Sequence, residues 1–310
     1  MNICLLEQSG TVPDNLTRVR RAACSRVGWG FHRLNWNQAT WLNEHEATIR
    51  QANVTWSEGR SRLYESASPD DYDYYVFIDD DISFHKRYSN RCTAVKSIFG
   101  NSYAKAPDVS ETAEALHEIE RLLVDYRPIT GTVFSPTDWG HKWARRPEKL
   151  GRDRETFPVA CHDLQVQIFR RDVARLAFPS PLSGSGGSMW FAQFAGFIGW
   201  PKSQLCLTSL EARNNRHLEH HDRDLSQFRS PYQIHSQLAP LVRNSSWAYW
   251  KPGILQGEGY GHEINRAAYD LSPDRPSLDL DIGNVWESIF DVVGLERLRS
   301  ASWKGSSDEI

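Results

Sequence analysis

A continuous apolar run that ends in three consecutive aspartates is the feature that most constrains the fold of this chain. Residues 74–78, with the sequence Tyr-Tyr-Val-Phe-Ile, are aromatic or β-branched and follow the turn-like residues 68–71. Such a run, bounded by turn signals, is typical of a strand buried on both faces of a sheet. Asp79, Asp80 and Asp81 follow it directly. The run predicts a layered α/β architecture, because helices must cover both faces of such a strand.

The spacing of apolar residues predicts further strands and helices on both sides of this run. A helix is clearest over residues 110–125, where Ser110 is the expected N-cap and the apolar residues share one face. The charged residues 211–228 are also predicted to be helical, and residues 139–156 to form a surface excursion. The other predicted strands are residues 1–6, 30–34, 129–134 and 166–169, and the other predicted helices are residues 16–23, 38–52, 56–66 and 171–176.

Charge and cysteine usage exclude several classes of protein. The formal net charge of −3 provides no global field that would draw the chain to nucleic acid or anionic lipid. The basic pair Arg20-Arg21 is interpreted as part of a solvated helix face. Five widely spaced cysteines without a C-x-x-C pair are typical of reduced, mostly buried residues. No signal peptide and no stretch of ~18 apolar residues is found, so a cytoplasmic protein is expected.

The aspartate cluster has the chemistry of a metal site. The carboxyl ends of strands in open α/β sheets are where ligands bind. If the segment stays extended, Asp79 and Asp81 point to the same face, because side chains repeat every two residues along a strand. Mg²⁺ and Mn²⁺ prefer oxygen ligands and leave positions open for phosphate oxygens. The alternative is an acidic turn that caps the strand with soluble residues.

Residues 55–62 and 74–81 together resemble the donor half of GT-A glycosyltransferases with a DxD motif, which are family 2-like nucleotide-sugar enzymes. Those enzymes begin a helix with Gly- or Ala-Arg-Asn about twenty residues before a strand that closes in D-x-D. Here Gly59-Arg60 stands 19 positions before Asp79, and Ser61 replaces the usual Asn. From the residues alone, a surface Arg60 paired with Glu58 or Asp70 is equally open.

The resemblance implies a GT-A (Rossmann-like) fold, with a mostly parallel central sheet flanked by helices and an elaborated C-terminal acceptor region. No internal repeat or linker divides the chain, so a single domain over residues 1–310 is expected. Within it, residues 1–105 would form the nucleotide-sugar donor half and residues 106–272 the acceptor and catalytic half. Residues 273–310 would form a C-terminal extension.

The resemblance also implies an activity. The chain would be a hexosyl- or pentosyltransferase that moves a sugar from a nucleoside-diphosphate sugar, foremost a UDP-sugar, to a hydroxyl acceptor. A glycan, a protein, a small molecule or a nucleobase could be that acceptor. Arg60, Trp56, Asp79 and Asp80 would bind the donor, and Asp81 together with Asp79 would hold Mn²⁺ or Mg²⁺.

Later residues complete the expected site by the same resemblance. Asp163 would act as the base that takes the proton of the acceptor hydroxyl. His217 and His220 are candidates for the late histidine that completes the metal site in many GT-A enzymes. The alternatives are an aspartate that caps the next segment and a charged, solvated helix. The order His217-Leu-Glu-His220-His221 differs from H-E-x-x-H, which excludes a metalloprotease.

Two other functions fit parts of the pattern. An apolar strand followed by D-x-D is also typical of haloacid dehalogenase-like, Mg²⁺-dependent phosphatases, in which Asp79 would be the nucleophile and Asp81 the general acid. Against that reading, about 75 residues precede the strand, which normally opens that fold. The twelve tryptophans are also compatible with a non-catalytic carbohydrate-binding protein.

Overall fold

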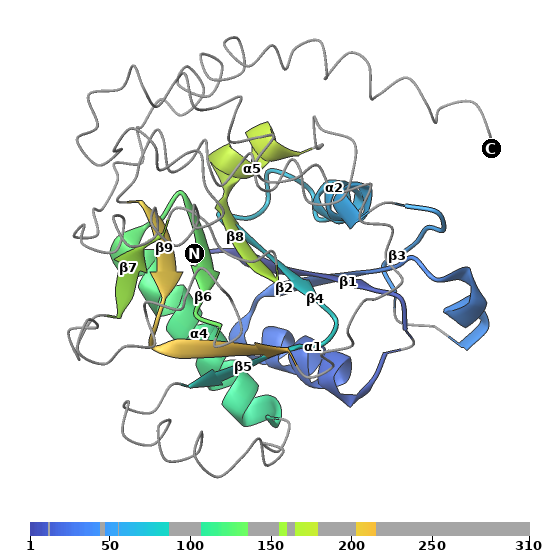
Figure 1. The fold of residues 1–310 in the computed structure, drawn as a ribbon, viewed down its shortest axis with the longest axis horizontal. Coiled ribbons are helices and arrows are strands. Elements are labelled where there is room, and N and C mark those ends of the chain that lie inside the picture. Colours follow the sequence, from blue (N-terminus) through green and yellow to red (C-terminus); the bar gives the residue numbers. More distant parts are fainter. Residues whose placement is uncertain are drawn as a thin grey trace, which may run out of the picture.

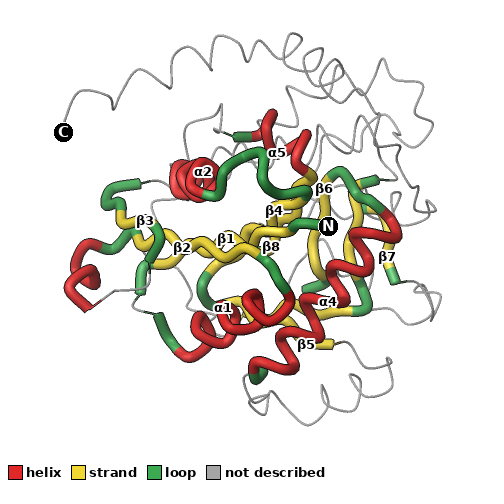
Figure 2. Tube along the Cα trace, turned by 180° about the vertical axis from the view of Figure 1, so that it is seen from behind, coloured by secondary structure: helices red, strands yellow, loops and turns green. Residues whose placement is uncertain are grey.

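The computed structural model of the 310-residue chain has an eight-stranded sheet between two layers of helices (Figure 1). Helices α1 (Asn15–Val27) and α4 (Val109–Tyr126) lie on one face, and α2 (Trp56–Ser66) and α5 (Arg171–Ala177) lie on the other. Figure 2 shows the same two layers from behind. The predicted α/β architecture is therefore confirmed. The structure describes residues 1–11, 13–43, 47–54, 56–86, 107–135, 155–159, 165–178 and 203–214.

Four parallel strands form one half of the sheet, in the order β3 (Ile49–Arg50), β2 (Gly30–Asn35), β1 (Ile3–Ser9) and β4 (Tyr74–Asp79). All residues of β1 are buried, and so are all of β4 except its last, as expected for strands covered on both faces. Because these strands are parallel, the loops that follow β1, β2 and β4 meet at one edge of the sheet. We call this edge the carboxyl edge.

The other half of the sheet mixes strand directions. β8 (Val166–Arg170) runs antiparallel to β4 and to β6 (Thr130–Val133). β9 (Gln204–Leu207) is parallel to β6, and β7 (Thr156–Pro158) is antiparallel to β9. Six of the eight strands thus point the same way, so the sheet is mostly parallel. Thr156, which the sequence places in a surface excursion, instead begins the buried strand β7.

A two-stranded ribbon leaves the sheet after β4. β5 (Ile82–Lys86) pairs antiparallel with β10 (Leu210–Asn214), and its side chains Ile82 and Phe84 belong to the same apolar core as α4. The helix predicted over residues 211–228 is therefore wrong at its start, because residues 211–214 pair with β5 in a strand. Residues 215–228 lie outside the described residues.

The helix predicted over residues 38–52 is also wrong. Among the described residues of this range, a short 3-10 helix forms, η1 (Gln38–Asn43), and Ile49 pairs in parallel with Leu34 at the outer side of β2. Side-chain contacts to the end of β2 compete with a helix here, since the Trp41 indole Nε1 donates to the backbone oxygen of Asn35 at 3.3 Å. Strand pairing and local side-chain bonds override the helical spacing.

The N-cap of helix α4 lies two residues earlier than predicted. Asp108, and not Ser110, is the N-cap: its carboxylate accepts from the Glu111 backbone N–H at 2.9 Å, and the Glu111 side chain accepts from the Asp108 backbone N–H at 3.1 Å. This reciprocal pair is a capping box, which satisfies two N–H groups at once. Buried apolar residues confirm the predicted inner face of α4; they include Ala113, Leu116, Ile119, Leu122 and Leu123.

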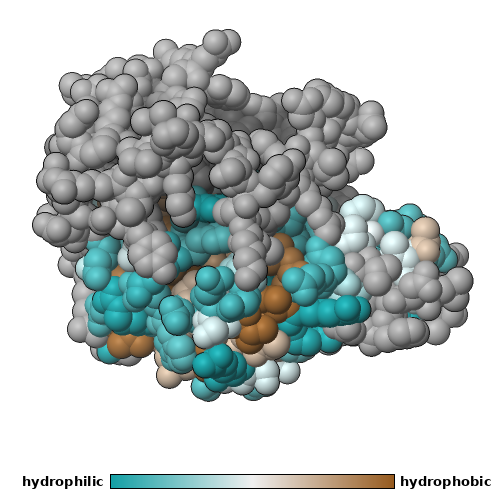
Figure 3. All heavy atoms as spheres, turned by 90° about the horizontal axis from the view of Figure 1, so that it is seen from below, coloured by the Kyte–Doolittle hydropathy of each residue, from teal (hydrophilic) through white to brown (hydrophobic). Residues whose placement is uncertain are grey.

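The described surface seen from below, on the side of α1 and α4, is mostly hydrophilic with apolar residues between (Figure 3). Cys4, Cys24 and Cys206 are reduced and buried, as predicted, while Cys92 and Cys161 lie outside the described residues. Burial raises the pKa of the Cys24 thiol to about 12, so it stays protonated at neutral pH.

No helix in the described ranges combines the length and apolar character needed to cross a membrane.

Candidate functional site

The three aspartates lie at the carboxyl edge, but not on one extended segment. β4 ends at Asp79, and Asp80 and Asp81 form the turn that leads into β5. The prediction that Asp79 and Asp81 alternate along a strand is therefore wrong. The turn is needed because β5 pairs with β10 in a separate ribbon, so the chain must leave the main sheet at this point. All three aspartates are partly exposed.

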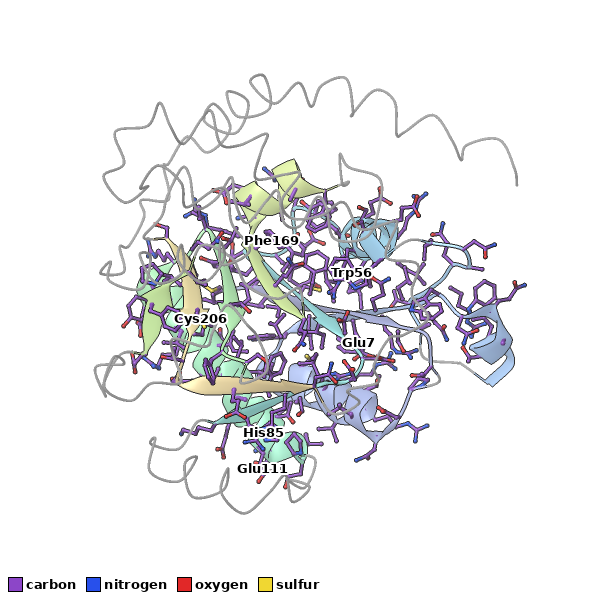
Figure 4. The ribbon with its side chains drawn as sticks, viewed as in Figure 1. Glu7, Trp56, His85, Glu111, Phe169 and Cys206 are labelled. Carbon is purple, nitrogen blue, oxygen red and sulfur yellow. The ribbon has the colours of Figure 1, made fainter. Side chains whose placement is uncertain are left out.

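Arg60 and Trp56, from the first two turns of α2, both contact Asp79. Arg60 Nη2 donates to Asp79 Oδ1 at 2.7 Å, and the Trp56 indole Nε1 donates to the same oxygen at 3.2 Å. The Arg60 guanidinium also stacks 4.4 Å above the Trp56 ring, a cation–π contact. Figure 4 shows Trp56 between α2 and the sheet. The structure thus brings together three of the residues predicted to bind the donor.

Arg60 is fully buried, so the alternative of a surface arginine paired with Glu58 or Asp70 is wrong. Burial lowers the pKa of its guanidinium to about 10, while the charge of Asp79 opposes that shift. The group therefore stays protonated at neutral pH. Among the described residues, its Nε and Nη1 atoms have no hydrogen-bond partner. Buried donors of this kind are costly unless something accepts from them.

A glycine allows α2 to approach the sheet this closely. A Cβ atom added to Gly59 would lie 2.4 Å from Nε2 of Gln8, the residue of β1 that is paired with Asp79. That distance is shorter than real Cβ contacts allow. Gly59 therefore leaves room for the Gln8 side-chain amide next to the start of α2, and a larger residue there would require that side chain to move.

The Asp80 carboxylate faces the loop after β1. Its Oδ2 atom accepts from Ser9 Oγ at 2.6 Å and from Thr11 Oγ1 at 2.9 Å. Its backbone oxygen accepts from Arg20 Nη2 at 2.8 Å. Asp80 thus joins two neighbouring loops of the carboxyl edge, whereas the sequence assigns it to the donor.

Asp81 has a strongly perturbed carboxylate. Burial, together with the negative charges of Asp79 and Asp80, raises its pKa to about 7. A nearby cation would favour the charged form. Across the described ranges, no group of three or more His, Cys, Asp or Glu side chains is arranged to hold a metal ion. A Mg²⁺ site that the substrate completes needs only one or two carboxylates, so Asp81 and Asp79 still fit this smaller requirement.

A buried ion network beneath these loops was missed by the sequence reasoning. Glu7 of β1, Arg20 of α1 and Arg33 of β2 are all fully buried. Glu7 accepts from Arg20 Nη2 at 2.6 Å and from Arg33 Nε at 3.0 Å. The interpretation of Arg20 as a solvated residue is wrong. The spacing in the sequence could have indicated this burial. Arg20 lies one helical turn after the buried Leu16, so the two side chains share one face of α1.

The remaining predicted site residues lie outside the described part of the chain. These are Asp163, the expected base, and His217 and His220, the expected late metal ligands. The structure neither brings them to the carboxyl edge nor separates them from it. Their roles stay predictions.

Comparisons with known proteins return only distant structural likeness. No protein-family profile and no curated protein matches the chain. Residues 1–349 of TarS from S. aureus match with a TM-score of 0.43 and 8% identity, over 96% of this chain and 83% of that one. A longer TarS chain matches with a TM-score of 0.42 and 10% identity, over 96% of this chain and 50% of its own.

A provisionally assigned nucleotide-diphospho-sugar transferase from Desulfovibrio desulfuricans G20 matches with a TM-score of 0.34 and 10% identity, over 78% of this chain and 96% of that one. Similarity at this level assigns no function to the chain. Its function is therefore argued below from its own residues.

Proposed function

We propose that the chain is a glycosyltransferase that binds a nucleoside-diphosphate sugar at the carboxyl edge and transfers the sugar to a hydroxyl acceptor. The donor is proposed to be a UDP-sugar, and the transfer to require Mn²⁺ or Mg²⁺. Ligands of open α/β sheets bind at this edge of the sheet. Three carboxylates, a buried arginine and a tryptophan gather there in this chain.

The contact between Arg60 and Asp79 is the observation that carries the proposal. Arg60 is fully buried at the start of α2, yet two of its nitrogens have no hydrogen-bond partner among the described residues. A guanidinium fork suits phosphate and carbonyl oxygens, because it can donate two parallel hydrogen bonds. Asp79 fixes one side of the fork at 2.7 Å and thereby orients the group for a polar ligand.

The proposed metal ligands are Asp81 and Asp79. Asp81 carries a carboxylate whose charged form is disfavoured by burial and by two neighbouring aspartates, and a divalent cation would reverse that balance. When bound, the cation would offset the negative charge that develops on the departing nucleoside diphosphate. Donor phosphate oxygens and His217 or His220 are proposed to complete the coordination. Asp80 supports the site through its contacts with Ser9 and Thr11.

On the acceptor side, Asp163 is proposed to take the proton of the attacking hydroxyl. A glycan, a protein, a small molecule or a nucleobase could supply that hydroxyl. The chain is proposed to act in the cytoplasm.

A phosphatase of the haloacid dehalogenase type is not favoured. In that reading Asp79 would attack phosphorus as a free carboxylate. Here one of its oxygens already accepts hydrogen bonds from both Arg60 and Trp56, which draws electron density away from a nucleophile.

The direct test is a transfer assay. The chain is incubated with Mn²⁺ and a panel of UDP-, GDP- and CMP-sugars, together with pooled glycan, protein, metabolite and nucleic-acid acceptors, and the products are identified by mass. We expect one donor to give an acceptor mass increased by one sugar residue, and Asp81→Ala to give none. Release of phosphate from simple phosphoesters without any sugar transfer would support the phosphatase instead.

A further inference from the structure

The acid Glu7 lies in the middle of the ion network beneath the carboxyl edge and is fully buried (Figure 4). Both of its carboxylate oxygens are used. Oε2 accepts from Arg20 Nε at 2.9 Å and from Arg20 Nη2 at 2.6 Å. Oε1 accepts from Arg33 Nε at 3.0 Å and from Thr17 Oγ1 at 2.8 Å. An isolated buried carboxylate is very unfavourable, so this acid depends on its two arginines.

Each arginine continues the network to a different loop. Arg20 Nη2 donates to the backbone oxygen of Asp80 at 2.8 Å, and Arg20 Nη1 donates to the backbone oxygen of Ile82. Arg20 therefore fixes the backbone of the aspartate turn on both sides of Asp81. None of these contacts involves the Asp81 side chain.

Arg33 makes the equivalent contacts to the loop after β1. Its Nη2 atom donates to Ser9 Oγ at 2.8 Å and to the backbone oxygen of Thr11. Ser9 and Thr11 in turn donate to the Asp80 carboxylate at 2.6 and 2.9 Å. The contacts form a closed ring. From Glu7 it runs through Arg20 to the backbone of Asp80, and it returns from the Asp80 carboxylate through residues 9–11 and Arg33 to Glu7.

The charges in this ring balance. Glu7 and Asp80 are acids, and Arg20 and Arg33 are bases, so two negative groups face two positive ones. Such a network is more costly than an apolar core unless all its members are satisfied, and its best-attested use is to specify one arrangement of the parts it joins. Here the joined parts are the aspartate turn, which carries proposed metal ligands, and the neighbouring loop after β1, which contacts it through Ser9 and Thr11.

We propose that Glu7 is a positioning residue: through Arg20 and Arg33 it sets the spacing between residues 9–11 and residues 79–82, and thereby the shape of the donor site. The proposal rests on the proposed function where it concerns the donor. Where it concerns the two loops, it stands on the hydrogen bonds and ion pairs described above. Glu7 itself touches no ligand in this account, because it is fully buried beneath the loops.

The test uses the full chain and two measurements on each variant: hydrogen exchange of peptides across the sheet, and the Kd for UDP with Mn²⁺. In Glu7→Gln we expect amide exchange to rise together in residues 9–11 and 79–82, by at least about tenfold, because a neutral amide supports the two arginines poorly. We expect the Kd to rise about tenfold as the site loses its arrangement. Ser9→Ala, which removes one link of the ring, should produce the same pattern at about threefold.

Arg170→Gln is the matched control. Arg170 is also buried and ion-paired, with Asp172 at 2.6 Å, but it lies at the opposite edge of the sheet, where it is paired with the first residue of β4. This variant should lose stability, while the exchange of both loops and the Kd for UDP stay within about twofold of the wild type.

Several outcomes would overturn the positioning role. One is an even rise of exchange over the whole sheet in Glu7→Gln; another is a Kd in Ser9→Ala equal to that of the wild type. If Glu7→Gln fails to fold, the same exchange and Kd measurements are made on Ser9→Ala and Arg33→Lys instead. If the wild type binds no nucleoside diphosphate, the proposed function fails, and the exchange measurements still decide whether Glu7 positions the loops.

Discussion

Arg60 donates to Asp79 across 19 positions of sequence, from the first turns of α2 to the last residue of β4, at 2.7 Å. The contact joins the two sequence segments that resemble the donor half of GT-A glycosyltransferases. Just before Arg60, Gly59 lies against the side-chain amide of Gln8 of β1. Arg60 and Asp79 are thus held together by a direct ion pair. Substitutions around this pair can distinguish residues that bind a ligand from residues that support the fold.

Trp56→Phe removes one hydrogen bond to Asp79 and keeps an aromatic ring beneath Arg60. The indole Nε1 donates at 3.2 Å, and the ring stacks on the guanidinium at 4.4 Å. We expect the free energy of unfolding to fall by about 1 kcal/mol, and the Kd for UDP with Mn²⁺ to rise about fivefold. Trp56→Leu, which also removes the cation–π contact, should weaken binding further. Chemical denaturation and calorimetric titration measure both effects, and equal Kd values in all three proteins would refute the role of Trp56.

Asp81→Asn should raise the stability of the ligand-free protein and abolish its response to UDP with Mn²⁺. The substitution removes one of three adjacent carboxylates without changing the size of the side chain. Because burial and the charges of Asp79 and Asp80 disfavour the Asp81 carboxylate, we expect the ligand-free protein to gain about 0.5–1 kcal/mol of stability at neutral pH. The same variant should lose the stabilisation that UDP with Mn²⁺ gives the wild type. Thermal unfolding with and without ligand measures this, and a destabilised variant that still responds to UDP would contradict the account.

The capping box of α4 should affect stability alone. Asp108→Ala removes the carboxylate that accepts from the Glu111 backbone N–H at 2.9 Å, so we expect a loss of about 1 kcal/mol. Ser110→Ala should cost at most a few tenths of that, because Ser110 is not the cap. Denaturant titration distinguishes the two variants. Neither should change nucleotide binding, and a reversed order of the losses would show that the cap is assigned wrongly.

His85 should make stability depend on pH. Burial and the charge of Arg213 lower the pKa of His85 to about 4 from 6.5, against the opposing charges of Glu211 and Glu111. Figure 4 shows His85 and Glu111 on the side of the ribbon near α4. A lowered histidine pKa means that the unfolded chain takes up the proton first as the pH falls. The stabilising contribution of neutral His85 is therefore full above pH 6.5 and is lost between pH 6.5 and about 4.

The variant His85→Gln should flatten this part of the pH profile. His85 is partly exposed, so we expect the flattening to amount to about 1–2 kcal/mol after allowance for solvent screening. Unfolding free energies measured by denaturant titration over that pH range test this. A profile with the same slope in the variant and the wild type would show that other groups cause the pH dependence.

The sequence predicted the donor-side elements well, because their signals are local. β4 is a continuous apolar run, and α2 was predicted with the bounds Trp56–Ser66 that the structure shows. The elements missed or mistaken depend on distant partners. β10 forms a strand because it pairs with β5, although its charged sequence indicates a helix, and Ile49 pairs with Leu34 where a helix was expected. Propensity yields to such pairing.

The site was predicted in part, for a similar reason. The spacing of the motif predicted that Arg60 and Asp79 bind one donor, but not that they contact each other. The direction of the Asp80 side chain depends on Ser9 and Thr11, about seventy positions earlier. Glu7 was missed because the predicted strand ended at residue 6, whereas β1 continues to Ser9 and buries Glu7. Its partners, Arg20 and Arg33, come from two further elements.

The most direct test of the central claim is calorimetric titration of UDP into the wild type and Asp81→Asn, each with and without Mn²⁺. We predict that UDP binds the wild type at least about tenfold more tightly with Mn²⁺ than without it, and that Asp81→Asn loses this difference while it stays folded. A Kd in Asp81→Asn that depends on Mn²⁺ as strongly as the wild type's would contradict the account, as would no binding of UDP, GDP or CMP under any of these conditions.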